Sequence, residues 1–168
     1  MQTVPEVIDD DLDALLGALD TPMSVVDQRL RTRFGQHTIV WEGDASTFQY
    51  TFVGDAALEV LGYPLERWVG EPTFWVDVVI HESDRSDAVS YCALATGLKR
   101  HHVFDYRGRA ADGRVIWFRD FVKVVLSPKG IPLRLRGFML DVSTRYMEMS
   151  NYKKHESPSR DELDAMSA

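Results

Sequence analysis

The single cysteine and three of the histidines are the side chains that could ligate a cofactor or react. Cys92 stands alone, so the chain can form neither an internal disulfide nor a cysteine metal cluster. It lies within a predicted helix over residues 84–96 and is expected to be a small buried apolar residue. His81 directly precedes that helix, where a turn or capping role is expected. His101 and His102 are adjacent on a predicted strand, so they point to opposite faces and cannot chelate one ion together.

Arg119 is a charged residue among the mainly apolar residues on one face of a predicted strand. A buried guanidinium needs an anion, and three environments remain open: a cross-strand acid such as Asp105, a ligand carboxylate, or an edge position in water. The sequence has no glycine-rich phosphate loop, no Gly-x-Ser-x-Gly motif and no paired histidines at metal spacing. We therefore predict no catalytic residues and no enzyme activity.

Composition narrows the class of protein further. The 168 residues suit one domain with extensions, and 45% of them are hydrophobic. The 26 acidic and 19 basic residues give a net charge of −7, which argues against binding to a phosphate backbone. The N-terminus lacks a basic signal region, and no apolar stretch approaches the ~20 residues that span a bilayer. We expect a cytoplasmic domain without nucleic-acid or membrane partners.

Periodicity and turn residues give the order of the elements. A leading helix from residue 9 is followed by two strands, several short helices, one longer helix and three strands. The strands are expected at residues 37–42, 47–53, 103–109, 115–126 and 133–142. This order predicts an α+β fold, in which one five-stranded antiparallel sheet carries short helices on one face.

The predicted strand over residues 115–126 is apolar on both faces. One phase contains Val115, Trp117, Arg119, Phe121, Lys123 and Val125, and the other Arg114, Ile116, Phe118, Asp120, Val122 and Val124. Because side chains alternate between faces, both faces of the sheet must be covered. We assign the outer face to the N-terminal amphipathic helix, supplied by this chain, by a second copy or by both. Its leucines, predicted to support a homodimer, are Leu12, Leu15, Leu16 and Leu19.

Aromatic residues gather on the sheet and in the short helices opposite it. The candidate pocket residues are Trp41, Phe52, Trp75, Tyr91, Phe104, Tyr106, Trp117, Arg119, Phe121 and Phe138. An aromatic half-shell suits a flat ligand, and it equally suits a filled core. The pattern does not decide which phase of residues 115–126 faces inward.

Several short motifs, in this order along the chain, resemble a PAS domain of the PAS_3 type. They are Thr51-Phe52-Val53-Gly54-Asp55-Ala56-Ala57, Leu61-Gly62-Tyr63-Pro64, Phe74-Trp75, His81-Glu82-Ser83-Asp84-Arg85, Asp112-Gly113-Arg114-Val115-Ile116-Trp117 and Arg136-Gly137-Phe138-Met139-Leu140-Asp141-Val142-Ser143. The resemblance spans residues 38–146. Glu82 stands where the family usually has proline and Ser143 where it has threonine, and neither change threatens the fold.

The resemblance implies a sensory or dimerisation module that feeds an output domain, as in a two-component system. In this family the ligand lies between sheet and helices, and signals leave through the end of the last strand, here Asp141, Val142 and Ser143. The flavin chemistry of light-sensing members needs a cysteine in an Asn-Cys-Arg context, which Cys92 lacks. A flavin held without a cysteine bond therefore remains an alternative. In this family haem iron is usually ligated by a histidine on the longest helix. The corresponding predicted helix of this chain has no histidine, so haem is not expected.

These observations predict three parts of the chain. Residues 1–36 form a helical cap or dimerisation segment, residues 37–146 a PAS domain, and residues 147–168 a polar linker or tail. The predicted function is a homodimeric sensory domain that senses a small ligand or couples to a signalling partner. Two alternatives remain: a ligand-free interaction or dimerisation module with a filled core, and a small-molecule enzyme on a cavity-forming α+β fold.

Overall fold

The sheet is the centre of the structure. The computed structural model describes residue 7 and residues 9–156, with only the backbone of residues 151–156. Within these residues, five antiparallel strands lie in the order β2-β1-β5-β4-β3. They are β1 (Ile39–Asp44), β2 (Tyr50–Val53), β3 (His102–Arg109), β4 (Val115–Leu126) and β5 (Pro132–Asp141). The predicted α+β fold is confirmed.

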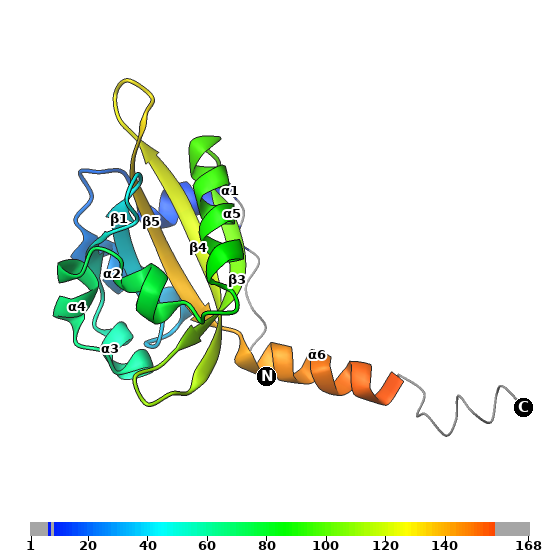
Figure 1. Ribbon diagram of the computed structural model, residues 1–168. Coiled ribbons are helices and arrows are strands. Elements are labelled where there is room, and N and C mark those ends of the chain that lie inside the picture. The colour runs from blue at the N-terminus through cyan, green and yellow to red at the C-terminus, as the bar shows by residue number, and fades with distance from the viewer. Residues whose placement is uncertain (1–6, 8, 157–168) are drawn as a thin grey trace, which may run out of the picture.

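Helices cover both faces of the sheet (Figure 1). The inner face carries α3 (Ala56–Leu61), α4 (Leu65–Gly70), the short π-helix η1 (Trp75–Val79) and α5 (Arg85–Gly97). The outer face carries α1 (Asp9–Leu16) and α2 (Met23–Phe34). The last helix, α6 (Ser143–Glu156), follows β5 and extends away from the sheet.

The chain's own N-terminal helices cover the outer face. Leu12, Leu15 and Leu16 of α1 are buried against a cluster in which Phe121 and Phe138 stack with ring centroids 4.7 Å apart. The sequence left open whether this chain or a second copy supplies the leucine face, and the structure shows that this chain does.

A buried arginine fixes the end of α1 on the sheet. Arg136 of β5 is 2% exposed, pairs with Glu42 of β1 at 2.8 Å and donates to the carbonyl oxygen of Leu16 at 3.0 Å. That carbonyl lies at a helix end, where backbone acceptors lack partners within the helix. Because a buried guanidinium needs all its donors satisfied, this contact specifies how α1 docks.

Two segments differ from the sequence prediction. Residues 143–156 form α6, although residues 147–168 were predicted as a polar linker or tail; residues 157–168, and residues 1–6 and 8 of the predicted cap, lie outside the described residues. β2 begins at Tyr50 rather than at residue 47. Asp44 Oδ1 accepts the backbone N–H groups of Ser46 and Thr47, which form a turn instead of extending the strand.

Candidate functional site

A polar cluster is buried in the aromatic interior between the sheet and the inner helices. Asp120 of β4 is fully buried and accepts hydrogen bonds from Trp41 Nε1 at 2.9 Å and from the Tyr106 hydroxyl at 2.8 Å. The Tyr106 hydroxyl in turn accepts from Trp75 Nε1 at 3.0 Å. Residues from β1, η1, β3 and β4 therefore meet at one carboxylate. We call Trp41, Trp75, Tyr106 and Asp120 the Asp120 cluster.

A glycine lets the Trp41 indole reach this carboxylate. Trp41 pairs with Gly137 of β5, and a Cβ added at Gly137 would lie 2.6 Å from the indole ring and 2.5 Å from the carbonyl oxygen of Phe121. Any larger residue at position 137 would displace the ring. The close approach of backbone and indole therefore depends on glycine at this position.

Burial raises the pKa of Asp120 to about 7, against the opposing effect of the hydrogen bonds from Tyr106 and Trp41. Both donors are neutral, and no arginine or lysine of the described residues forms an ion pair with this carboxylate. Burial also raises the pKa values of Tyr50 and Tyr106 well above their usual range, so both hydroxyls stay protonated. Asp120 is thus the group of the cluster whose charge changes near neutral pH.

Side chains fill most of the interior. Trp41, Tyr50 and Trp75 stack in succession, and the cavity beside them is about 10 Å³, close to the space that one water molecule needs. The Tyr50 hydroxyl is buried and has no hydrogen-bond partner among the described residues. One polar group at the wall of this cavity is therefore unsatisfied.

This interior does not fit a flavin. Pockets for ligands of that size measure roughly 300–1,000 Å³, far above the cavity of about 10 Å³. Burial, and then the charge of Asp120, raise the pKa of Cys92 to about 12, so its thiol is a poor nucleophile. The residues beside the cavity therefore offer neither the space nor the reactive thiolate that a flavin adduct requires.

The adjacent histidines point to opposite faces, as predicted. His102 faces the interior, where its Nε2 lies 3.4 Å from Cys92 Sγ, and burial lowers its pKa. His101 lies 3.1 Å from Asp13 of α1 on the outer face. Across the described residues, no group of three or more histidines, cysteines or acids is placed to hold a metal ion.

The predicted pocket residues separate into three places. Trp41, Trp75 and Tyr106 belong to the Asp120 cluster. A more open cleft of about 280 Å³, near the free edge of β3, is lined by Tyr91, Phe104, Tyr106 and Trp117 with Asp84, Asp87, Ala88 and Asp105. The remaining residues lie on the outer face: Phe52, Arg119, Phe121 and Phe138.

The assignment of those last residues to the interior pocket is corrected by the structure. Phe52, Phe121 and Phe138 pack in the outer core with α1 and α2. The inner face of β4 presents the other phase, which includes Asp120. Both phases of β4 are mainly apolar, so hydrophobicity could not choose between them. Arg119 takes one of its predicted partners, because it forms two hydrogen bonds with Asp105, of 2.7 and 2.8 Å.

Asp120 itself was missed as a site residue. The sequence did indicate it, because Asp120 is an acid among the apolar residues Ile116, Phe118, Val122 and Val124 on one face of β4. It is as unusual there as Arg119 is on the other face. A buried acid requires hydrogen-bond donors or protonation. Choosing the correct phase of β4 would have identified it.

The start of α6 is fastened to the outer face of β3 and β4. The rings of Trp117 and Tyr146 stack with centroids 4.0 Å apart and 4° between their planes. The Tyr146 hydroxyl donates to Asp105 Oδ2 at 2.7 Å, beside the ion pair of Asp105 with Arg119. Burial acts to raise the pKa of Asp105, but the hydrogen bonds from Arg119 and Tyr146 outweigh it and the pKa is lowered. We call Asp105, Trp117, Arg119 and Tyr146 the α6 latch.

The predicted output residues form the joint between β5 and α6. The backbone N–H of Trp117 donates to Ser143 Oγ at 2.9 Å, and the N–H of Val142 donates to the Trp117 carbonyl oxygen at 2.8 Å. Asp141 Oδ1 accepts from the N–H of Ser143 at 2.9 Å. The joint is therefore bonded directly to β4 at the residue that also stacks on α6.

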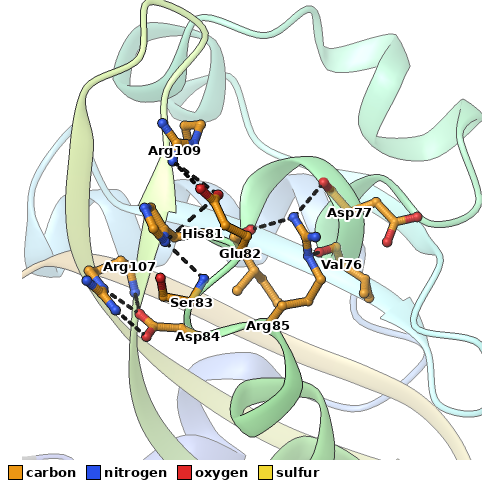
Figure 2. A network of polar contacts seen from close by, with 10 residues as sticks. Val76, Asp77, His81, Glu82, Ser83, Asp84, Arg85, Arg107 and Arg109 are labelled. Atoms are coloured by element: carbon orange, nitrogen blue, oxygen red, sulfur yellow. Dashed lines mark hydrogen bonds and ion pairs between the residues drawn. The ribbon is translucent and has the colours of Figure 1, made fainter.

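A second polar network fixes the start of α5 against β3 (Figure 2). Asp84 accepts two hydrogen bonds from the Arg107 guanidinium, at 2.9 and 2.7 Å, and one from the Arg107 backbone at 2.8 Å. Arg85 donates to backbone carbonyl oxygens of η1 and of the residue after it. His81 Nδ1 accepts from the N–H of Ser83, which is the turn role predicted for it. This network is structural: it holds α5 over the interior.

Comparison with known proteins identifies the family. Residues 50–139 match the PAS_3 family, described as the PAS fold, and the chain belongs to this family. No curated protein is similar enough to match. Among the described residues, no helix combines the length and apolar character needed to cross a bilayer.

Solved structures with the same fold come from signalling proteins. The N-terminal domain of a diguanylate cyclase with PAS/PAC sensor from Marinobacter aquaeolei is 30% identical, with a TM-score of 0.58, over 65% of this chain and 98% of that one. A sensory box histidine kinase/response regulator from Burkholderia thailandensis E264 is 18% identical, with a TM-score of 0.62, over 82% and 97%. A LOV protein from Rhodobacter sphaeroides is 15% identical, with a TM-score of 0.54, over 62% and 59%. The chain is thus a PAS sensory domain of the kind found in signal-transduction proteins.

Proposed function

We propose that this PAS domain passes changes in its interior to a signalling partner or output domain through β4 and α6. The observation that carries the proposal is the double role of β4. Asp120 faces the interior cluster, while the adjacent Arg119 and the nearby Trp117 belong to the α6 latch. Because alternate residues of one strand share a backbone, a displacement of β4 at the cluster also moves the latch.

The kind of output follows from the relatives. One similar structure belongs to a diguanylate cyclase and another to a histidine kinase/response regulator, so we propose an output of this signalling class. The joint at Asp141, Val142 and Ser143 is the proposed exit of the signal. We propose that the domain senses rather than catalyses; a cytoplasmic location stays a prediction.

Two inputs are candidates. The filled interior favours a ligand-free interaction module, whereas the unpartnered Tyr50 hydroxyl and the buried Asp120 favour an interior that responds to a small species. Native mass spectrometry distinguishes the two. A retained small molecule would support ligand sensing, and the mass of the chain alone would favour the interaction module.

Homodimerisation also stays a proposal. Leu12, Leu15 and Leu16 are buried within one chain, while Leu19 is 42% exposed. Of the predicted leucines, only Leu19 is therefore available to a second copy. Leu19 follows the end of α1, and a stable dimer would need contacts beyond it, because one leucine buries too little area.

A pair of matched substitutions tests the route through β4. Tyr106→Phe removes the hydroxyl that bonds Asp120 and Trp75, and Tyr63→Phe removes a hydroxyl that, among the described residues, bonds only the Arg109 carbonyl oxygen. We expect Tyr106→Phe to destabilise the cluster by about 1–3 kcal/mol and to speed hydrogen exchange of the α6 amides.

Tyr63→Phe should leave α6 exchange unchanged. Protection of amides in β1 and β5, measured in the same experiment, separates a local change at α6 from general destabilisation. Equal α6 exchange in the two variants would contradict the route through β4.

A further inference from the structure

We propose that the Asp120 cluster is a proton-binding site, and that uptake or release of one proton at the Asp120 carboxyl is a signal passed to α6. This inference rests on the proposed function, because it names the species to which the interior responds. It differs from the predicted aromatic ligand pocket, since the site is one carboxyl rather than a cavity.

The surroundings of Asp120 leave an ionised carboxylate without a counter-charge. The groups facing this interior carry no charge near pH 7: Trp41 of β1, Tyr50 of β2, Trp75 of η1, Cys92 of α5, His102 and Tyr106 of β3, and Met139 of β5; burial lowers the pKa of His102. The cations of β4 and β5 have acidic partners other than Asp120: Arg119 pairs with Asp105, Lys123 with Asp13, Arg134 with Asp44 and Arg136 with Glu42. Asp44, at the edge of the cavity, is bonded within its own turn to Ser46 and Thr47 and pairs with Arg134. A fully buried carboxylate in such surroundings favours its protonated form.

Proton uptake changes the direction of one hydrogen bond. When ionised, Asp120 accepts from both Trp41 and Tyr106. When protonated, its new O–H needs an acceptor, and the Tyr106 oxygen 2.8 Å away is in place. Tyr106 must then direct its own proton elsewhere, and Met139 Sδ lies 3.6 Å from that hydroxyl. Binding of one proton from solvent therefore reverses the bond between β3 and β4.

A second buried hydroxyl lies in the same interior. The Tyr50 hydroxyl has no partner among the described residues, and burial, followed by the charges of Tyr106 and Asp120, raises its pKa. Tyr50 also stacks on Trp41, a donor to Asp120. The two charge states of Asp120 thus favour different orientations of the hydroxyls around it.

Carbon NMR of the full chain tests the site directly. We expect the carboxyl carbon of Asp120, assigned by its loss in Asp120→Asn, to titrate with a midpoint near pH 7, well above the exposed aspartates. The carboxyl signal also separates this titration from that of His102, which is the other group that can change charge in the same interior.

Hydrogen exchange of the α6 amides over the same pH range tests the coupling. After correction for intrinsic exchange, we expect protection of residues 146–150 to change at least about fivefold with the same midpoint. The change should disappear in Asp120→Asn and persist in Asp87→Asn, a matched change of an exposed acid on α5.

The outcomes separate the two proposals. An Asp120 midpoint near 7 with a matching change at α6 supports both. The same midpoint without a change at α6 supports the proton site and overturns its role as a signal. A carboxyl that does not titrate between about pH 5.5 and 8.5 overturns the proton site, and the Tyr106→Phe comparison still decides the route through β4.

Discussion

Replacing Asp120 with asparagine should change how the stability of the chain depends on pH. Burial raises the pKa of this carboxyl from 3.8 to about 7. The folded chain therefore keeps a proton on Asp120 at pH values where the unfolded chain has lost it. The stabilisation is complete below the unfolded pKa and is lost as pH rises through the folded pKa.

The size of the effect follows from this shift. At about 1.4 kcal/mol per pKa unit the shift corresponds to roughly 4 kcal/mol, of which about 2–3 kcal/mol is lost between pH 5 and pH 8. Asparagine stays neutral throughout. Its oxygen can accept from Trp41 and its NH2 can donate to the Tyr106 oxygen, so the hydrogen bonds of the protonated acid are preserved. We expect Asp120→Asn to gain about 2–3 kcal/mol over the parent chain as pH rises from 5 to 8.

Urea unfolding at several pH values, followed by tryptophan fluorescence, measures this difference. Taking the difference between the two chains removes the contribution of His102, whose pKa burial lowers and which titrates in both. Asp105→Asn is the matched control. The pKa of Asp105 is lowered, so its contribution is present above the unfolded pKa and is lost only as pH falls through the folded pKa. The difference in unfolding free energy between Asp105→Asn and the parent chain should therefore not change with pH above pH 5. An equally constant difference for Asp120→Asn would refute the reasoning.

Three further outcomes are expected. Cys92, buried with a pKa of about 12, should react with a disulfide reagent only at the rate of unfolding, and rapid labelling of the native chain would contradict its burial. Gly137→Ala should cost at least about 1–3 kcal/mol in urea unfolding because its Cβ meets the Trp41 ring, whereas Gly97→Ala, with nothing within 4 Å, should be neutral or stabilising; equal effects would count against the close approach. Light scattering should give twice the mass of one chain for the parent and for Leu12→Ala, which removes a leucine buried within the chain; a monomer mass for the parent would end the dimer proposal.

Most of the fold was predictable because each element has a strong local signal. The order of strands and short helices follows from alternation and turn residues, and β4 was predicted with its observed ends. The coverage of both faces of β4 followed from its two apolar phases. The packing of the α1 leucines on the outer face was also predictable, because an amphipathic helix of this length needs a surface to pack on.

The rest depended on tertiary contacts that no local pattern encodes. Hydrophobicity could not assign the phases of β4, so Phe121 and Phe138 were placed inside and Asp120 was overlooked. α6 carries few apolar residues, and its start is held by Tyr146 against Trp117 and Asp105 rather than by an apolar stripe. In both cases an element is positioned by partners distant in sequence.

The position of β5 has a consequence for how the chain folds. β1 and β5 are neighbours in the sheet, and Ile39 pairs with Met139 across almost the whole domain. During synthesis β1 and β2 emerge early, but β5 emerges last of the strands, so the two halves of the sheet cannot join until the ribosome has passed residue 141. Closing so long a loop slows folding and leaves strand edges unpaired meanwhile. A nascent chain that stalls before β5 should therefore be a client for chaperones.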